Sequence, residues 1–133
     1  MINEKQCPCD SGLNFLECCT NFISGDSVPL TAEALMRSRY SAYVLGNADY
    51  IVETTHPKKR TILLEKSVTN WIEEASFQKL EIINTGMGQE KDKAGKVEFK
   101  AFYTSNDTKT THHELSKFKK YDGKWYFFDG EVF

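Results

Sequence analysis

All four cysteines of this chain lie within thirteen positions, in the segment CPCDSGLNFLECC. They form two close pairs, Cys7-x-Cys9 and Cys18-Cys19, with eight residues between the pairs. A zinc ion takes four thiolate or imidazole ligands in a tetrahedron, and two such pairs joined by a turn can surround it with little chain. Ser11-Gly12 suits that turn, because glycine adopts backbone angles that other residues resist. The spacing therefore favours a metal site near the N-terminus.

Disulfide bonds and reactive redox thiols are the alternative uses of these cysteines. A disulfide framework is typical of secreted proteins, but MINEKQCPCD lacks the apolar stretch of a secretory signal. The chain also lacks a long apolar run that would predict a transmembrane helix. We therefore expect a cytoplasmic protein with reduced thiols, which binds zinc through Cys7, Cys9, Cys18 and Cys19.

The composition is that of a folded domain. A chain of 133 residues fits one domain with a small appendage, and its 40% hydrophobic content, with nine Phe and six Tyr, predicts a packed core. The net charge of −2 creates no strong field toward nucleic acid or anionic lipid, so we expect neither as a partner. We interpret the basic segment HPKKR (56–60) as a solvated helix start.

Helical signals come first along the chain. Thr31 fits an N-cap before the apolar periodicity of TAEALMRSRYSAYVL, and Gly46 fits its C-terminal end. Asn47 can cap a short helix, ADYIVETT, and a third helix is predicted at about 61–75.

Strand signals follow after Ser76. Asp122-Gly123 is a strong hairpin signal between the last two strands. The four predicted strands are QKLEIIN, KVEFKAFYT, KTTHHELSKFKKY and KWYFFD. Helices followed by an antiparallel meander predict an α+β domain over residues 31–133, after a metal-binding motif at 1–24.

The cysteine segment resembles the SEC-C motif, a small zinc-binding element also found at the end of the SecA translocation ATPase. That motif runs C-x-C-x(8)-C-[CH], commonly with Gly-Ser-Gly after the second cysteine. Asp10 stands at the first of these glycine positions, and LNFLE replaces lysines that are common in the loop. Leu13, Phe15 and Leu16 therefore offer an apolar surface, which either packs on the main domain or faces a protein partner.

Two further segments carry a wider resemblance. LMRSRYSAYVLGNADYIVETTHP (35–57) and DGKWYFFDG (122–130) are similar to the YchJ-type family of small bacterial proteins. The resemblance implies an N-terminal SEC-C motif followed by a nuclear-transport-factor-2-like domain, in which three helices lie in a strongly curved antiparallel sheet that forms a cone. This family has no settled biochemical activity, so the resemblance implies a fold and a metal but no reaction.

Candidate ligand-binding residues are Arg39, Tyr40 and Tyr103. A guanidinium at the mouth of a cavity can hold a carboxylate or phosphate with two hydrogen bonds. The alternative is an ion pair between Arg39 and a glutamate that locks helix to sheet, and this is the interpretation that we favour.

Candidate catalytic residues are His56, Asp129 and His113. His56 suits either a general base or a helix cap, and Asp129 suits either a buried acid or a cap on the turn that follows it. His112 and His113 are adjacent on a predicted strand, so only one of them can face inward.

Two classes of function are compatible with these features. The first is a non-catalytic interaction or adaptor module, monomer or homodimer, with a structural zinc site and room for a small ligand in the cone. The second is an isomerase, dehydratase or hydrolase that acts on a small molecule in the cone cavity. We favour the first, because a zinc ion with four cysteine ligands has no open position at which to activate water.

Overall fold

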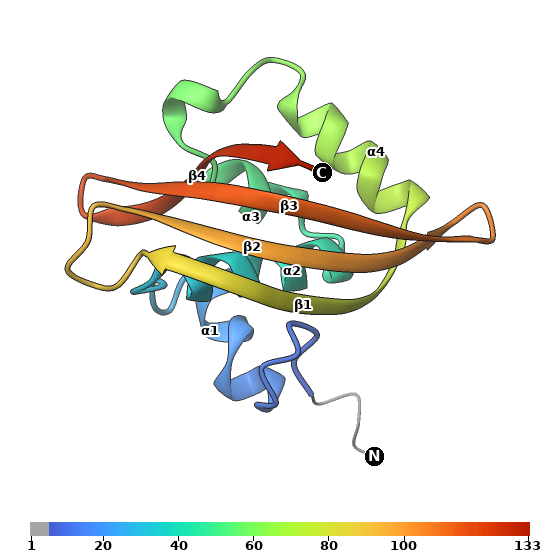
Figure 1. Cartoon of the computed structure of the whole chain (residues 1–133), viewed down its shortest axis with the longest axis horizontal. Coiled ribbons are helices and arrows are strands. Elements are labelled where there is room, and N and C mark those ends of the chain that lie inside the picture. Colours follow the sequence, from blue (N-terminus) through green and yellow to red (C-terminus); the bar gives the residue numbers. More distant parts are fainter. Residues whose placement is uncertain (1–5) are drawn as a thin grey trace.

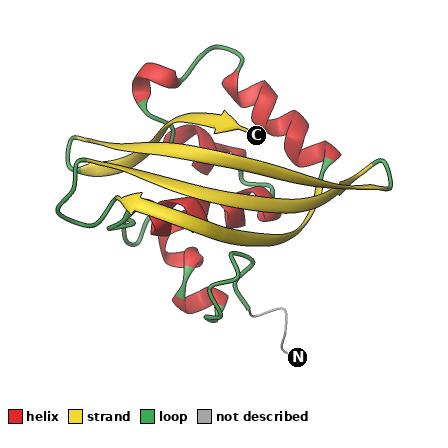
Figure 2. Ribbon diagram, in the orientation of Figure 1, coloured by secondary structure: helices red, strands yellow, loops and turns green. Residues whose placement is uncertain are grey.

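The computed structural model describes residues 6–133, which form one layer of helices against one antiparallel sheet (Figures 1 and 2). The first five positions of the predicted 1–24 motif lie outside the described residues. The helices are α1 (Cys19–Ile23), α2 (Ala32–Leu45), α3 (Ala48–Glu53) and α4 (Leu64–Glu74), with short 3-10 helices at Phe15–Glu17 and Pro57–Lys59. The strands are β1 (Ser76–Met87), β2 (Ala94–Ser105), β3 (Thr108–Tyr121) and β4 (Lys124–Val132).

Polar caps define the ends of α2 and α3, as the sequence predicts. The Thr31 hydroxyl accepts a hydrogen bond from the Ala34 amide at 3.1 Å, and Gly46 ends α2 with a φ of 77°. The Asn47 side chain accepts from the Tyr50 amide at 3.0 Å and starts α3. The predicted third helix is shorter than expected, since α4 begins only at Leu64.

The four strands follow one another in the order β1-β2-β3-β4 and are antiparallel throughout. Asp122 and Gly123 have φ values of 54° and 82°, as the tight hairpin predicted between β3 and β4 requires. Register shifts interrupt β1 between Phe77 and Lys79, and again between Ile82 and Asn84. Such bulges bend a strand and increase its twist, so they curve the sheet around the helices. The predicted α+β architecture is confirmed.

The cysteine loop (residues 7–19) is part of the main core. Cys7, Cys9 and Cys19 are buried in the same cluster as Leu35 of α2 and Phe99 of β2. In Figure 1 the loop and α1 lie beside β1 and α2. The cysteine loop is therefore packed against the helix–sheet domain (residues 31–133) and does not hang from it as a free appendage.

In the part of the chain that the structure describes, none of the helices is long and apolar enough to cross a membrane.

Candidate metal centre and central cavity

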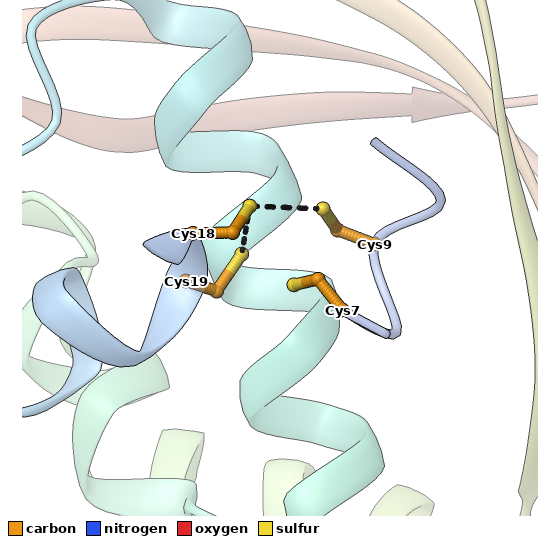
Figure 3. A group of neighbouring side chains, drawn as sticks. All are labelled: Cys7, Cys9, Cys18 and Cys19. Atoms are coloured by element: carbon orange, nitrogen blue, oxygen red, sulfur yellow. Dashed lines mark hydrogen bonds between the residues drawn. The ribbon is translucent and has the colours of Figure 1, made fainter. Parts of the chain in front are cut away.

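The four cysteine side chains converge on one point (Figure 3). All four sulfur atoms lie within 4.8 Å of one another. The Sγ atom of Cys18 is 3.7 Å from that of Cys9 and 3.8 Å from that of Cys19. A disulfide requires about 2.05 Å, and all four cysteines are free. The arrangement is that of a ligand cluster.

Ionisation of the cluster is unequal when the sulfurs have only each other as partners. Hydrogen bonds with Cys19 and Cys9 lower the pKa of Cys7, whereas the hydrogen bond with Cys7 raises the pKa of Cys19. Ionisation of one thiol therefore makes ionisation of its neighbour less favourable, and burial further disfavours the charged form. A cation among the sulfurs would offset this repulsion, and the thiolate is the form in which cysteine binds a metal.

Polar neighbours surround the sulfur cluster. The Ser11 hydroxyl lies 3.3 Å from the Cys18 sulfur, and the Ser41 hydroxyl of α2 lies 3.5 Å from the Cys7 sulfur. The Arg37 guanidinium donates to the Cys9 carbonyl oxygen at 2.6 Å, which brings a positive charge close to the loop. Donors and a cation at these positions stabilise a negatively charged thiolate site.

Two apolar side chains of the cysteine loop stay exposed. Leu13 and Leu16 are 52% and 66% exposed, whereas Phe15 packs against the main core. The predicted apolar surface is thus divided between the helix–sheet domain and solvent.

A cavity of about 290 Å³ lies between the helices and the sheet, and we call it the central cavity. Arg39 and Tyr40 line it, as do Tyr43, Trp71 and Phe77. Tyr103 is not among its lining residues, although its ring lies 5.9 Å from that of Trp71. Two of the three predicted ligand-binding residues therefore face a common space.

Arg39 is only 7% exposed, and its hydrogen bonds differ from the ion pair that we favoured. Its Nη1 atom donates to the Ile51 carbonyl oxygen at 3.0 Å and to the hydroxyls of Thr54 and Thr55 at 2.8 and 3.3 Å. Among residues 6–133, no carboxylate lies within 4.0 Å of its guanidinium. The predicted Arg39–glutamate ion pair is therefore wrong, because the end of α3 supplies neutral oxygen acceptors instead.

A hydrogen-bonded group that we did not predict faces the same cavity. His112, Glu114 and Ser116 alternate along β3 and so share one face of the sheet. The Glu114 carboxylate accepts from His112 Nε2 at 2.8 Å and from the Ser116 hydroxyl at 2.5 Å. Burial alone would raise the pKa of Glu114, but the hydrogen bonds from His112 and Ser116, together with the charges of His112 and Arg39, lower it overall.

None of the three candidate catalytic residues lines the central cavity. His56 caps a 3-10 helix, with Nδ1 accepting from the Lys58 amide at 3.1 Å. Asp129 is exposed and accepts from the Gly130 amide at 2.9 Å. His113 is on the opposite face of β3 from His112 and bonds Glu98 at 2.7 Å. The central cavity therefore brings none of these three side chains together, and the histidine that faces it is His112.

Comparisons with known proteins agree with this architecture. Residues 31–130 match the family described as YchJ, middle NTF2-like domain. A UPF0225 protein of Geobacter sulfurreducens is 46% identical over 93% of this chain and 77% of its own length. A UPF0225 protein of Corynebacterium glutamicum is 39% identical over 96% of this chain and 98% of its own length.

Two solved structures are similar over most of their length. A SEC-C motif containing protein from Rhodopseudomonas palustris has a TM-score of 0.87 and 38% identity, and the match covers 96% of this chain and 98% of that one. A SEC-C motif containing protein from Psychrobacter arcticus has a TM-score of 0.80 and 34% identity, with 96% and 82% covered. With its free cysteine cluster packed on an NTF2-like domain, the chain belongs to the YchJ family, whose relatives include these UPF0225 proteins.

Proposed function

We propose that this chain binds one Zn²⁺ through Cys7, Cys9, Cys18 and Cys19, and that the ion is structural and serves a non-catalytic interaction module. The spacing of the sulfur atoms carries this proposal. Zinc–sulfur bonds of about 2.3 Å in a regular tetrahedron place the sulfurs about 3.8 Å apart. The Cys9–Cys18 and Cys18–Cys19 sulfur distances are 3.7 and 3.8 Å.

The structural role follows from the number and burial of the ligands. Four cysteines complete the coordination of zinc, so no position is left for water or a substrate. Cys7, Cys9 and Cys19 are all buried in the main core, where a bound ion would join the cysteine loop to α2 and the sheet. Exposed Leu13 and Leu16, on the same loop, support contact with a protein partner.

Native mass spectrometry of the full chain, purified without chelator, tests the zinc assignment. We expect one zinc ion per chain. The Cys18→Ser variant should lose more than about 100-fold in zinc affinity in a chelator competition, because a ligand should matter more than an outer-shell group. Ser24→Ala, on the exposed end of α1, is the matched control and should keep full affinity.

Two results would contradict the proposal. Wild-type protein with reduced thiols and no bound metal would exclude a resident zinc ion. A Cys18→Ser variant with wild-type zinc affinity would mean that the metal binds elsewhere.

A further inference from the structure

Arg39 carries hydrogen-bond donors that the protein does not use. Its Nη1 atom makes the three hydrogen bonds to α3 and Thr55, and within residues 6–133 its Nε and Nη2 atoms have none. Both nitrogens are accessible to solvent, because every fully buried side-chain nitrogen or oxygen atom in the described residues has a hydrogen-bond partner. Arg39 lines the central cavity and is 7% exposed, so its unused donors open into that cavity.

A buried guanidinium without a counter-ion is costly, because it stays charged even where burial lowers its pKa. The groups inside the protein that can stabilise this positive charge interact with it only weakly. The Phe127 ring lies 4.7 Å from the guanidinium carbon, and Glu114 acts on it only across more than 4.0 Å. Nε and Nη2 present the parallel pair of N–H groups that a carboxylate accepts with both oxygens.

Most of the remaining wall of the central cavity is apolar, and the cavity is of limited size. Its aromatic and aliphatic lining includes Met36, Tyr43, Ile51, Trp71 and Phe77. Its volume of about 290 Å³ is roughly twice that of a cavity that accepts benzene, so it has room for a compact organic molecule of roughly a dozen non-hydrogen atoms.

Charge on the cavity wall further restricts the ligand. Glu114 lines the same space, and both oxygens of its carboxylate accept hydrogen bonds, one from His112 and one from Ser116. One cation and one anion on the wall disfavour a doubly charged phosphate, and the anion repels a ligand that enters in the reversed orientation.

We propose that the central cavity is a binding site for a small organic monocarboxylate, whose carboxylate accepts hydrogen bonds from Nε and Nη2 of Arg39 while its apolar body packs against Trp71 and Phe77. This inference is independent of the zinc site, because none of the four cysteines lines the cavity.

The chain contains two tryptophans that make the test internally controlled. Trp71 lines the central cavity, whereas the Trp125 indole is buried elsewhere and donates to the Leu30 carbonyl oxygen at 3.0 Å. We would titrate zinc-loaded, ¹⁵N-labelled protein with benzoate, phenylacetate, cinnamate and hexanoate, each paired with its uncharged primary amide. The indole N–H signals in ¹H–¹⁵N spectra would report binding.

We expect at least one acid to shift the Trp71 signal and leave Trp125 in place, and to bind at least about tenfold more tightly than its amide. Arg39→Lys should remove this preference, because an ammonium does not reproduce the two parallel N–H groups. Arg60→Lys is the matched control, since Arg60 is exposed, does not line the cavity and donates to the backbone oxygens of Thr55 and Glu53. It should retain the preference.

Ser67→Phe gives a second variant that leaves Arg39 intact. Ser67 is exposed at the rim of the cavity on α4, so a phenyl ring there should obstruct entry without burying a new polar group. It should weaken acid binding at least about tenfold. Acids and amides that bind wild type equally would overturn the proposal, and so would the absence of any Trp71 shift at about 10 mM probe. An unchanged preference in folded Arg39→Lys would overturn it as well.

Discussion

Replacement of Asp10 would separate two contributions that hold the cysteine loop in place. Asp10 has a φ of 62°, the left-handed region that explains why glycine is common at this position of the motif. Its carboxylate also accepts a hydrogen bond from the Leu80 amide of β1 at 2.9 Å, seventy residues away. Leu80 is 2% exposed, so water cannot readily replace that acceptor.

The magnitudes follow from these two features. Asp10→Ala leaves the Leu80 amide without a hydrogen-bond partner, which costs about 1–3 kcal/mol of stability. It also places alanine in the left-handed backbone region, which aspartate tolerates better, and this costs about 1 kcal/mol more. We therefore expect a loss of about 2–4 kcal/mol in the free energy of unfolding. Asp10→Gly should lose only about 1–3 kcal/mol, and Asp10→Asn, which keeps an acceptor, less than about 1 kcal/mol.

Urea unfolding followed by circular dichroism, in excess zinc, measures these differences by linear extrapolation. The expected order of stability is wild type, Asn, Gly and then Ala. Equal losses for Asp10→Asn and Asp10→Ala would refute the hydrogen-bond argument, because the amide side chain retains the acceptor. Equal losses for Asp10→Gly and Asp10→Ala would refute the backbone argument.

Three other predictions concern the helix–sheet domain. Burial and neighbouring lysines lower the pKa of His56 from its ordinary value of 6.5, so the folded protein favours the neutral imidazole. Stability should therefore fall as the pH drops below 6.5, and the His56→Asn variant should show a weaker pH dependence in urea unfolding. A β-carbon on Gly95 would collide with the Gly88 backbone, so Gly95→Ala should cost about 1–3 kcal/mol in thermal unfolding, whereas Gly86→Ala, which meets open space, should be nearly neutral. Tyr50→Phe removes a 2.7 Å hydrogen bond to a buried serine hydroxyl and should cost about 1 kcal/mol in urea unfolding.

Each of these expectations has a clear contrary result. A His56→Asn variant with the wild-type pH profile would assign the acid sensitivity to another group. Equal effects of alanine at Gly95 and Gly86 would contradict the steric argument. A Tyr50→Phe variant as stable as wild type would mean that the hydroxyl pair contributes nothing net.

Local chemistry explains what could be predicted from the sequence. The caps at Thr31 and Asn47, the end of α2 at Gly46 and the Asp122-Gly123 turn depend on residues within a few positions of one another. Such signals are readable because the partner is close in the chain. The cysteine cluster is predictable for the same reason, since its two pairs lie only eight residues apart.

Partners distant in sequence account for what was missed. Arg39 bonds the end of α3, and the identity of those acceptors depends on how α2 and α3 pack. Alternation along β3 places His112, Glu114 and Ser116 on one face, but only the packed helices decide which face is inside. The alternation of side chains thus shows that only one of His112 and His113 can face inward, but it does not show which one.

The contacts of Asp10 and His56 also bear on the solubility of this protein. An open four-stranded sheet has two edge strands whose free N–H and C=O groups can recruit another chain. At β1 the Leu80 amide is covered by Asp10 of the cysteine loop, and at β4 the segment at Thr54–His56 exchanges hydrogen bonds of 2.8 Å with Phe127. The contact at β1 comes from the cysteine loop and depends on the sulfur cluster, whereas the contact at β4 does not. If the cysteine cluster holds a metal as proposed, release of that ion should uncover β1 alone, and we expect chelated protein to self-associate, and eventually aggregate, through that edge.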